Sequence, residues 1–250
     1  NQASSALTPA PDFFFCGGQR HANSDGMTLT PLGDSAVVVA LDSGLDETGL
    51  RRVWALAAAL ERDRPAGVVD VVPAFASVTV FYDVAQFGGY ERLCREIATR
   101  AERVETADSR REARVIEIPV CYGGEGGADL ADVAAQAGLS SEEVVALHAG
   151  GDYLVQAIGF APGFAYLGGL PEKIHTPRRP TPRTVVPAGT VGIGGAQTGV
   201  YPLMTPGGWN LIGRTPLRLF DGRSHEPALL RAGDRVTFRA INAEEFAAWR

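Results

Sequence analysis

Residues 159–171 read GFAPGFAYLGGLP, residues 186–195 read VPAGTVGIGG and residues 206–215 read PGGWNLIGRT. Glycine or proline recurs every few residues in this stretch, which prevents a long helix and fixes turns, bulges or close backbone approaches. The short β-branched and aromatic runs between them are typical of strands. The stretch therefore predicts a compact β-barrel with tight corners. For any single glycine, the needs of a turn explain the residue better than a ligand contact does.

Upstream of this stretch, strands and amphipathic helices alternate. A valine-rich run at residues 36–41 predicts a buried strand, and apolar residues at helical spacing between 50 and 60 predict a helix against a sheet. Strands at residues 68–72 and 78–82 suit an antiparallel pair, and residues 90–104 form a second helix. This order is compatible with a small ferredoxin-like α/β domain. A strand at residues 115–120 either closes that sheet or begins the next domain.

The whole chain of 250 residues predicts an α+β fold with a tail and two domains. Residues 1–26 form the tail, 27–113 the α/β domain and 114–250 the β-barrel domain, with the charged segment 105–114 as the link. The barrel domain begins with helices at 130–137 and 141–148, the second with a capping box at Ser140 and Glu143. Short strands then run from 153–158 through 184–240, including one at 217–220, and a helix covers 243–250.

Composition excludes several classes of protein. A net charge of -6 argues against a nucleic-acid binder, which needs a basic patch. No run is long enough for a transmembrane helix, and the first residues lack the basic start and apolar core of a secretory signal. The cysteines at 16, 94 and 121 show no metal-ligand spacing and are read as reduced thiols. We therefore expect a cytoplasmic protein without contact to a membrane or to nucleic acid, and no metal site.

Familiar catalytic motifs are absent from the sequence. It contains no GxxxxGK[ST] phosphate loop, no HExxH metal motif and no GxSxG nucleophile elbow. The four histidines are scattered, and His148 is read as a residue at a helix end rather than as a base. Cys121 lies in a strand pattern without an activating neighbour. The catalytic residue is therefore left unassigned.

The remaining polar residues suit the binding of a small molecule that carries an anionic group or an amide. Arginine's planar fork matches carboxylate and phosphate geometry, and backbone N–H groups of glycine turns can stabilise a developing negative charge. Arg179 is as well explained by capping its own loop, and Phe160 and Phe164 are read as pocket wall or core. The predicted substrate- or phosphate-binding residues are Arg178, Arg183, Arg214, Gly163, Tyr166, Gln197, Tyr201, Gly207, Gly208 and Trp209.

GFAPGFAYLGGLP and the segment TPRRPTPRTVVPAGTVGIGGAQTGVYPLMTPGGWNLIGRTPL resemble the signature of the 5-oxoprolinase B-subunit family. That family is also described as allophanate hydrolase subunit 1, as the carboxyltransferase C/D-type domain and as the sporulation-kinase inhibitor. Weaker similarity at GDSAVVV (33–39) and IPVCYGG (118–124) extends the resemblance over nearly all of the chain from residue 28. It implies a cyclophilin-like barrel in the second domain. Thr190, where serine is expected, and residues 171–175 depart from the pattern.

The resemblance implies one component of a complex that hydrolyses the lactam 5-oxoproline to glutamate at the expense of ATP. The implied partners are a C-subunit-like protein (allophanate hydrolase subunit 2) and an A-subunit-like protein. ATP, with Mg²⁺, is implied at the level of the complex, and this chain is expected to be inactive alone. Two alternatives stay open: a component of a urea carboxylase-type carboxyltransferase, and a module that binds and inhibits a histidine kinase. The first is disfavoured because this chain has no biotin carrier.

Overall fold

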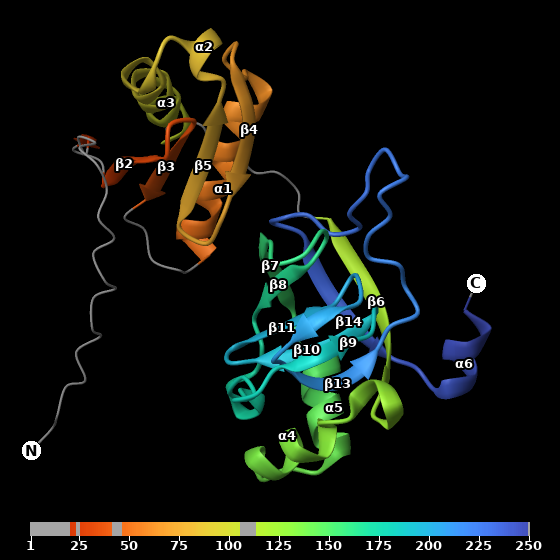
Figure 1. The fold of residues 1–250 in the computed structure, drawn as a ribbon. Helices are drawn as coiled ribbons and strands as arrows, with labels where there is room; N and C mark the ends of the chain where they lie inside the picture. The colour runs from red at the N-terminus through yellow and green to blue at the C-terminus, as the bar shows by residue number, and fades with distance from the viewer. Residues whose placement is uncertain (1–20, 24–25, 42–46, 106–113, 250) are drawn as a thin grey trace, which may run out of the picture.

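The structure is a computed structural model that describes residues 21–23, 26–41, 47–105 and 114–249. These residues form an N-terminal α/β domain and a C-terminal β-barrel domain, as Figure 1 shows. The predicted α+β class is therefore confirmed.

The first domain is built on an antiparallel sheet. Its strands lie in the order β1 (His21–Asn23), β2 (Met27–Leu32), β3 (Ala36–Leu41), β5 (Ser77–Tyr82) and β4 (Val68–Pro73). Residues 1–26 were predicted to form a tail, but His21–Asn23 in that range form an edge strand on β2. Backbone ladder hydrogen bonds need no apolar pattern, so composition did not reveal this strand.

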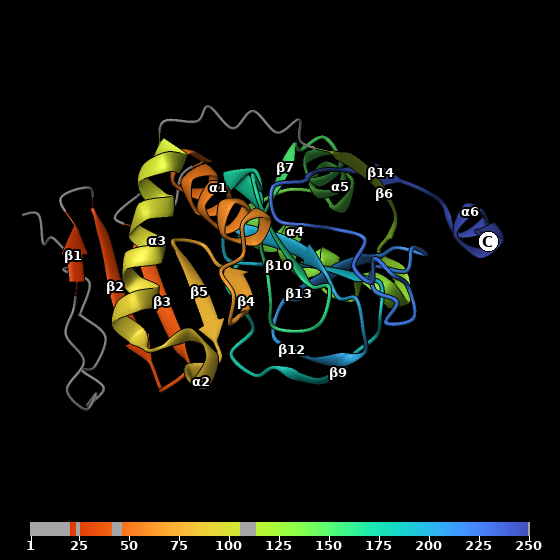
Figure 2. The same cartoon turned by 90° about the horizontal axis from the view of Figure 1, so that it is seen from above.

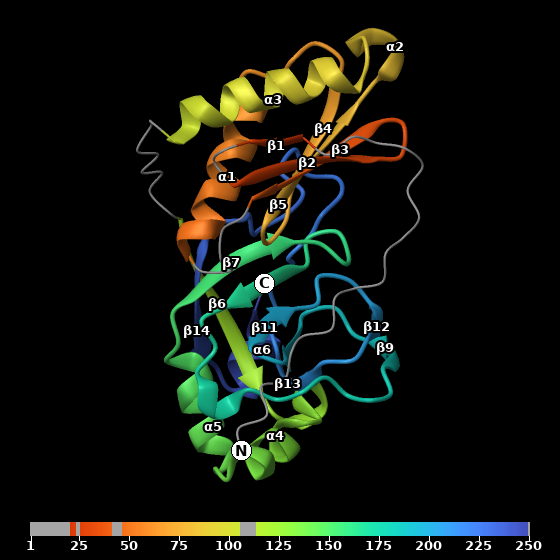
Figure 3. The ribbon, with the colours of Figure 1, turned by 90° about the vertical axis from the view of Figure 1, so that its left-hand side faces the viewer.

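Helices cover one face of this sheet. α1 (Glu47–Arg62) and α3 (Tyr90–Glu105) lie side by side on it, and the short α2 (Val84–Phe87) precedes α3 (Figures 2 and 3). Alternate strand residues such as Val37, Val39 and Val80 are buried beneath the helices, as a period of two requires. Leu60 from α1 and Ile97 from α3 complete the core.

The order of the chain settles how this sheet is completed. β3, α1, β4, β5 and α3 follow one another as in a ferredoxin-like domain, and β2 lies next to β3, with β1 at the edge outside it. The strand predicted at residues 115–120 belongs instead to the barrel. The α/β domain is thus complete before the barrel begins.

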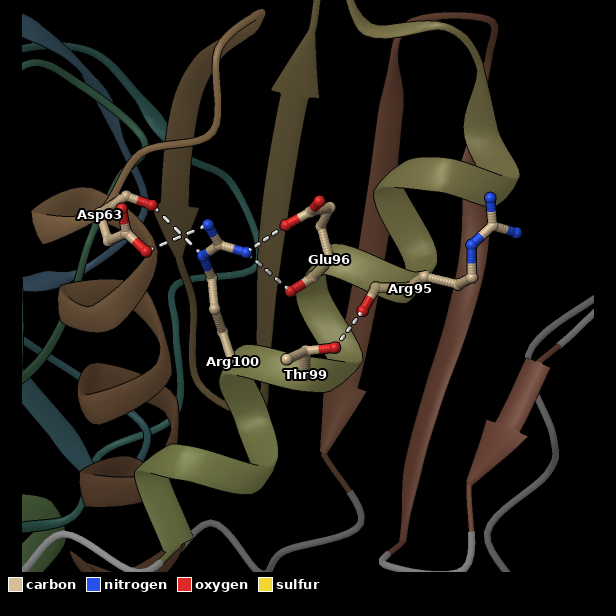
Figure 4. A network of polar contacts seen from close by, with 5 residues as sticks. All are labelled: Asp63, Arg95, Glu96, Thr99 and Arg100. Atoms are coloured by element: carbon tan, nitrogen blue, oxygen red, sulfur yellow. Dashed lines mark hydrogen bonds and ion pairs between the residues drawn. The ribbon is translucent and has the colours of Figure 1, made fainter.

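One arginine ties the two helices of the first domain together. Arg100 of α3 donates from Nε to the carbonyl oxygen of Asp63 and from Nη2 to its carboxylate, both at 3.2 Å, just beyond the end of α1 (Figure 4). Its Nη1 also reaches the Glu96 carboxylate at 2.5 Å. Thr99 donates to the Arg95 carbonyl one turn back, at 3.0 Å.

Seven strands close the barrel of the second domain. In spatial order they are β10 (Thr190–Gly194), β11 (Gln197–Val200), β8 (Ala165–Gly168), β7 (Tyr153–Ile158), β14 (Arg235–Ala240), β6 (Val115–Tyr122) and β13 (Asn210–Arg214), which pairs again with β10. All pairs are antiparallel except β6 with β14. The inward residues Ile118, Val155, Leu167, Ile193 and Val236 are fully buried.

Helices and a short ribbon surround the barrel. α4 (Leu130–Ala137) and α5 (Ser141–Ala149) lie together at the end far from the first domain (Figure 1), and the predicted capping box of Ser140 and Glu143 is present. β9 (Arg183–Val186) and β12 (Thr205–Gly207) form a separate two-stranded ribbon. α6 (Ala243–Ala248) follows β14, and two 3-10 turns lie at Gly124–Gly127 and Glu172–Ile174.

The prediction of a strand at residues 217–220 is wrong. This segment forms only one isolated bridge, Phe220 to Ala228. Leu219 is buried by packing on the barrel core, so the apolar run reflects core contact rather than a ladder. The short strands β8, β11 and β12 were not predicted.

No helix in the described part of the chain is long and apolar enough to cross a membrane. Cys94 and Cys121 are free thiols, whereas Cys16 lies outside the described residues. Within those residues, no group of three His, Cys, Asp or Glu side chains could hold a metal ion.

Candidate functional site

Aromatic rings and an arginine gather at one edge of the barrel. Phe164 lies at the centre, with its ring 5.0 Å from Tyr166, 5.3 Å from Tyr201 and 5.4 Å from Trp209, all edge to face. The Trp209 indole lies flat against Gly194, where a Cβ atom would approach it to 2.5 Å. These four rings, together with Arg178, are called the aromatic–arginine site below.

Arg178 is the exposed cation of this site. Its guanidinium carbon lies 5.8 Å from the centre of the Trp209 ring, within the range of a cation–π contact. Among the residues that the structure describes, Arg178 has no carboxylate partner. Its N–H groups are therefore available to a carboxylate or phosphate.

Tyr201 contributes a buried hydroxyl to the same site. Gly207 lies so close to it that a side chain there would collide with the phenol. Burial raises the pKa of Tyr201, while the nearby charges of Arg178 and Arg183 act in the opposite direction. The hydroxyl is therefore protonated at neutral pH and can donate a hydrogen bond.

Asp129 anchors the two arginines beside this site. Its Oδ1 accepts from Arg179 Nη1 at 2.9 Å and from Arg183 Nη2 at 2.7 Å, and its Oδ2 accepts from the Leu211 N–H at 2.7 Å. The carboxylate is only 2% exposed, so these donors replace its lost water. Asp129 was not predicted as a site residue, because its partners Arg179, Arg183 and Leu211 are 50 or more residues away in the chain. In the structure its side chain makes no cap hydrogen bond.

Two buried donors on these arginines have no partner. Arg179 Nε and Arg183 Nη1 are inaccessible to water and make no hydrogen bond within the described residues. A buried N–H without an acceptor costs about 1–3 kcal/mol.

A strained turn carries Phe160 at the rim of the site. Ala161 N–H donates to the Gly159 carbonyl at 2.8 Å and the φ of Phe160 is +70°, which together define a γ-turn with a positive central angle. Phe160 is 62% exposed, and its ring meets Phe164 at 5.5 Å. Backbone strain of this kind concentrates at functional segments, so an exposed aromatic on such a turn points to a contact.

The first domain also reaches this site. Phe75, in the turn between β4 and β5, packs edge to face on Tyr166 at a ring distance of 5.6 Å. Tyr166 therefore connects the α/β domain to the aromatic–arginine site. No motif or period in the sequence indicates this contact, because it joins residues of two domains.

The other predicted site residues make different contacts, although Gly163 and Gly208 are chain neighbours of Phe164 and Trp209 and so lie at the site. Gln197 donates to Gln156 at 2.8 Å, Gly163 lies against Phe220, and the Gly208 carbonyl accepts from the Arg179 backbone at 2.8 Å. Arg214 lies at the far end of β13 from Trp209 and donates from Nε to the Ala188 carbonyl at 3.0 Å. The structure thus brings Arg178, Arg183, Tyr166, Tyr201, Gly207 and Trp209 together and leaves Arg214 apart.

His148 is a core residue of the barrel. Its Nε2 lies 2.9 Å from Thr198 Oγ1, and its Nδ1 lies 2.8 Å from the Tyr122 hydroxyl. Because Thr198 donates its own proton to the Gly192 carbonyl, His148 must donate from Nε2 and accept at Nδ1. Burial lowers the pKa of His148 from 6.5 to about 3.

Comparison with known proteins assigns the family. The carboxyltransferase domain, subdomain C and D, matches residues 27–230. The 5-oxoprolinase B subunit of Bacillus subtilis (strain 168) is 45% identical, over 89% of this chain and 96% of that protein. The corresponding protein of Escherichia coli O157:H7 is 50% identical, over 83% and 93%. The chain belongs to the 5-oxoprolinase B-subunit family.

Solved structures add the fold of this family. The crystal structure of TTHA0988 is 41% identical, with a TM-score of 0.72 over 83% of this chain. The chain spans only 40% of TTHA0988, so the similarity covers less than half of that longer protein. The urea carboxylase of Kluyveromyces lactis has a TM-score of 0.68 at 19% identity, which shows a shared fold alone.

Proposed function

We propose that this chain is the B subunit of an ATP-dependent 5-oxoprolinase that hydrolyses 5-oxo-L-proline to L-glutamate. The observation that carries the proposal is the identity of 45–50% to the 5-oxoprolinase B subunits of two bacteria over most of both chains. The urea carboxylase of Kluyveromyces lactis shares the fold at 19% identity, and the urea amidolyase of Lachancea kluyveri is 38% identical over only 68 residues, so the carboxyltransferase alternative has less support.

The aromatic–arginine site is the place where this protein holds the substrate. 5-Oxoproline carries one carboxylate and one lactam on a small apolar ring. Arg178 takes the carboxylate, since it is an arginine of the site without an acidic partner among the described residues. The protonated Tyr201 hydroxyl and the partly exposed Arg183 guanidinium are the donors proposed for the lactam oxygen.

Partner proteins complete the site. Asp129 already accepts three hydrogen bonds and is not free to act as a base. We therefore place the missing groups on a C-subunit-like protein, docked at the rim that carries Phe160, and on an A-subunit-like protein. The greater length of TTHA0988 is consistent with a neighbouring unit that can be joined to this one. The complex works in the cytoplasm, where ATP is supplied.

ATP would make the stable lactam reactive by phosphorylating its oxygen, which then becomes a leaving group. The sequence has no phosphate loop, but its arginines match phosphate oxygens as well as carboxylates. In this proposal the chain orients the lactam and stabilises negative charge on its oxygen.

Co-expression with the two partner proteins tests the function. The purified complex should release glutamate from 5-oxoproline only when ATP and Mg²⁺ are present, and the isolated chain should release none. Substantial turnover by the chain alone would contradict the need for partners. A complex that assembles but carboxylates urea instead would overturn the proposed reaction.

A further inference from the structure

A cavity lies on the barrel, outside the aromatic–arginine site. It has a volume of about 500 Å³ and lies where α6 faces the segment after β13. Arg214 and Arg218 line it on the barrel side, and Phe246 and Trp249 line it on the side of α6. No residue of the aromatic–arginine site is among its walls.

The charge of this cavity is positive. Its lining contains two arginines and no acidic residue. Arg218 is held by Asp221 at 3.0 Å, whereas Arg214 has no carboxylate partner within the described residues. The Nε of Arg214 is fixed on the Ala188 carbonyl, which orients the guanidinium and leaves both Nη groups free for a ligand.

The opposite wall is apolar, although it does not belong to the core. α6 has no buried residue and is held at its start by the capping box of Asn242 and Glu245. Phe246 and Trp249 therefore follow a fixed helix start, and Trp249 keeps 41% of its surface exposed. Two aromatic side chains beside an arginine without an acidic partner form a surface with one apolar and one cationic half.

We propose that this cavity binds a small organic anion. A phosphate or carboxylate pairs with Arg214, and the uncharged part of the ligand packs on Phe246 and Trp249. The volume lies within the roughly 300–1,000 Å³ of small-molecule sites. The site itself does not depend on the proposed reaction, but the choice of probes rests on it, because that reaction uses ATP and 5-oxoproline.

Titration of the full isolated chain tests this inference. ATP, ADP, 5-oxoproline and inorganic phosphate are added separately, and binding is followed by calorimetry and by tryptophan fluorescence. We expect at least one organic anion to bind, Arg214→Gln to weaken it tenfold or more, and the exposed Arg223→Gln to leave it unchanged. Trp249→Ala should weaken the organic anion and abolish its fluorescence change.

The result also identifies the ligand. Preference for ATP and ADP assigns a nucleotide, and preference for 5-oxoproline assigns the substrate class. The proposal would be overturned if no probe binds or if Arg214→Gln binds as tightly as the wild type. It would also be overturned if inorganic phosphate binds as tightly as any organic probe, which would show an adventitious ion only. If Arg214→Gln fails to fold, Trp249→Ala on the half-exposed helix end carries the same test. Because no turnover is measured, failure of the oxoprolinase proposal would leave this result untouched.

Discussion

Arg183 and Asp129 are 54 residues apart in the chain, yet Arg183 Nη2 donates to Asp129 Oδ1 at 2.7 Å. This contact joins β9 to the start of α4, while the other carboxylate oxygen holds β13 through the Leu211 N–H. Arg183 therefore fastens the ribbon to the barrel in addition to any contact with substrate.

The stability of the fold should depend on this pair. Arg183→Ala removes one of the two guanidinium groups from a buried carboxylate, and we expect it to cost about 2 kcal/mol. For a chain of this size, that lowers Tm by roughly 4–8 °C. Calorimetry checks it, with Arg178→Ala as the matched control, because Arg178 pairs with no acid among the described residues. Equal Tm values for the two variants would show that the ion pair contributes little.

Arg178 should affect activity and not stability. In the assembled complex, Arg178→Ala should lower kcat/KM for 5-oxoproline by about a hundredfold, the cost of a lost charged hydrogen bond. Arg178→Lys should recover only part of the lost kcat/KM, because lysine lacks the planar fork of the guanidinium group. Arg223→Ala, a change at an exposed arginine elsewhere, serves as control. Unchanged kcat/KM in Arg178→Ala would remove this residue from the site.

Two variants of Phe160 distinguish the effect of backbone strain from the effect of losing the aromatic ring. Glycine accepts a φ of +70° freely, so Phe160→Gly should relieve about 1 kcal/mol of strain. Phe160→Ala should keep the strain. Both variants lose the ring, and both should bind the C-subunit-like partner more weakly if Phe160 lies in that interface. Titration calorimetry with the purified partner measures this, and wild-type affinity in both variants would place the interface elsewhere.

The buried His148 should make the barrel sensitive to acid. The pKa of His148 is about 3 in the folded chain and 6.5 when unfolded, so only the unfolded chain takes up a proton between these values. The contribution of His148 to the free energy of unfolding is therefore fully present well above pH 6.5, and it is lost progressively as the pH falls toward 3. Between pH 7 and pH 5 the loss from this residue is about 2 kcal/mol.

Urea unfolding at both pH values checks this expectation. His148→Gln should show a difference between pH 7 and pH 5 that is smaller by about that amount, whatever its stability at pH 7. A variant with the same pH dependence as the wild type would assign acid sensitivity to other groups.

Most helices and long strands could be predicted because their apolar periods are regular. The Tyr153–Ile158 strand and the Leu130–Ala137 helix were predicted with the same bounds. Strands of three or four residues, such as Ala165–Gly168, give too few positions for a period to show. At residues 217–220 the apolar run was real, but Leu219 packs on the core without a neighbouring strand.

The candidate site was predicted in its composition rather than in its geometry. Arg183 and Arg214 looked equivalent because each precedes a threonine in a Gly/Pro-rich segment. In the structure Arg183 pairs with the buried Asp129, whereas Arg214 lines a separate cavity. Such differences depend on residues distant in the chain, here Asp129 and α6, which local spacing cannot connect.

The parallel pair of β6 and β14 has a consequence for synthesis on the ribosome. Val115 lies beside Arg235, so β6, the first strand of the barrel, cannot pair with β14 until that last strand has been synthesised. The α/β domain can fold as soon as α3 has emerged, whereas the barrel stays open until residue 240 has left the exit tunnel. Until then β6 and β7 both lack β14 as a neighbour. A nascent chain stalled before residue 235 would therefore display two unpaired strand edges, which is the form most exposed to aggregation and to chaperones.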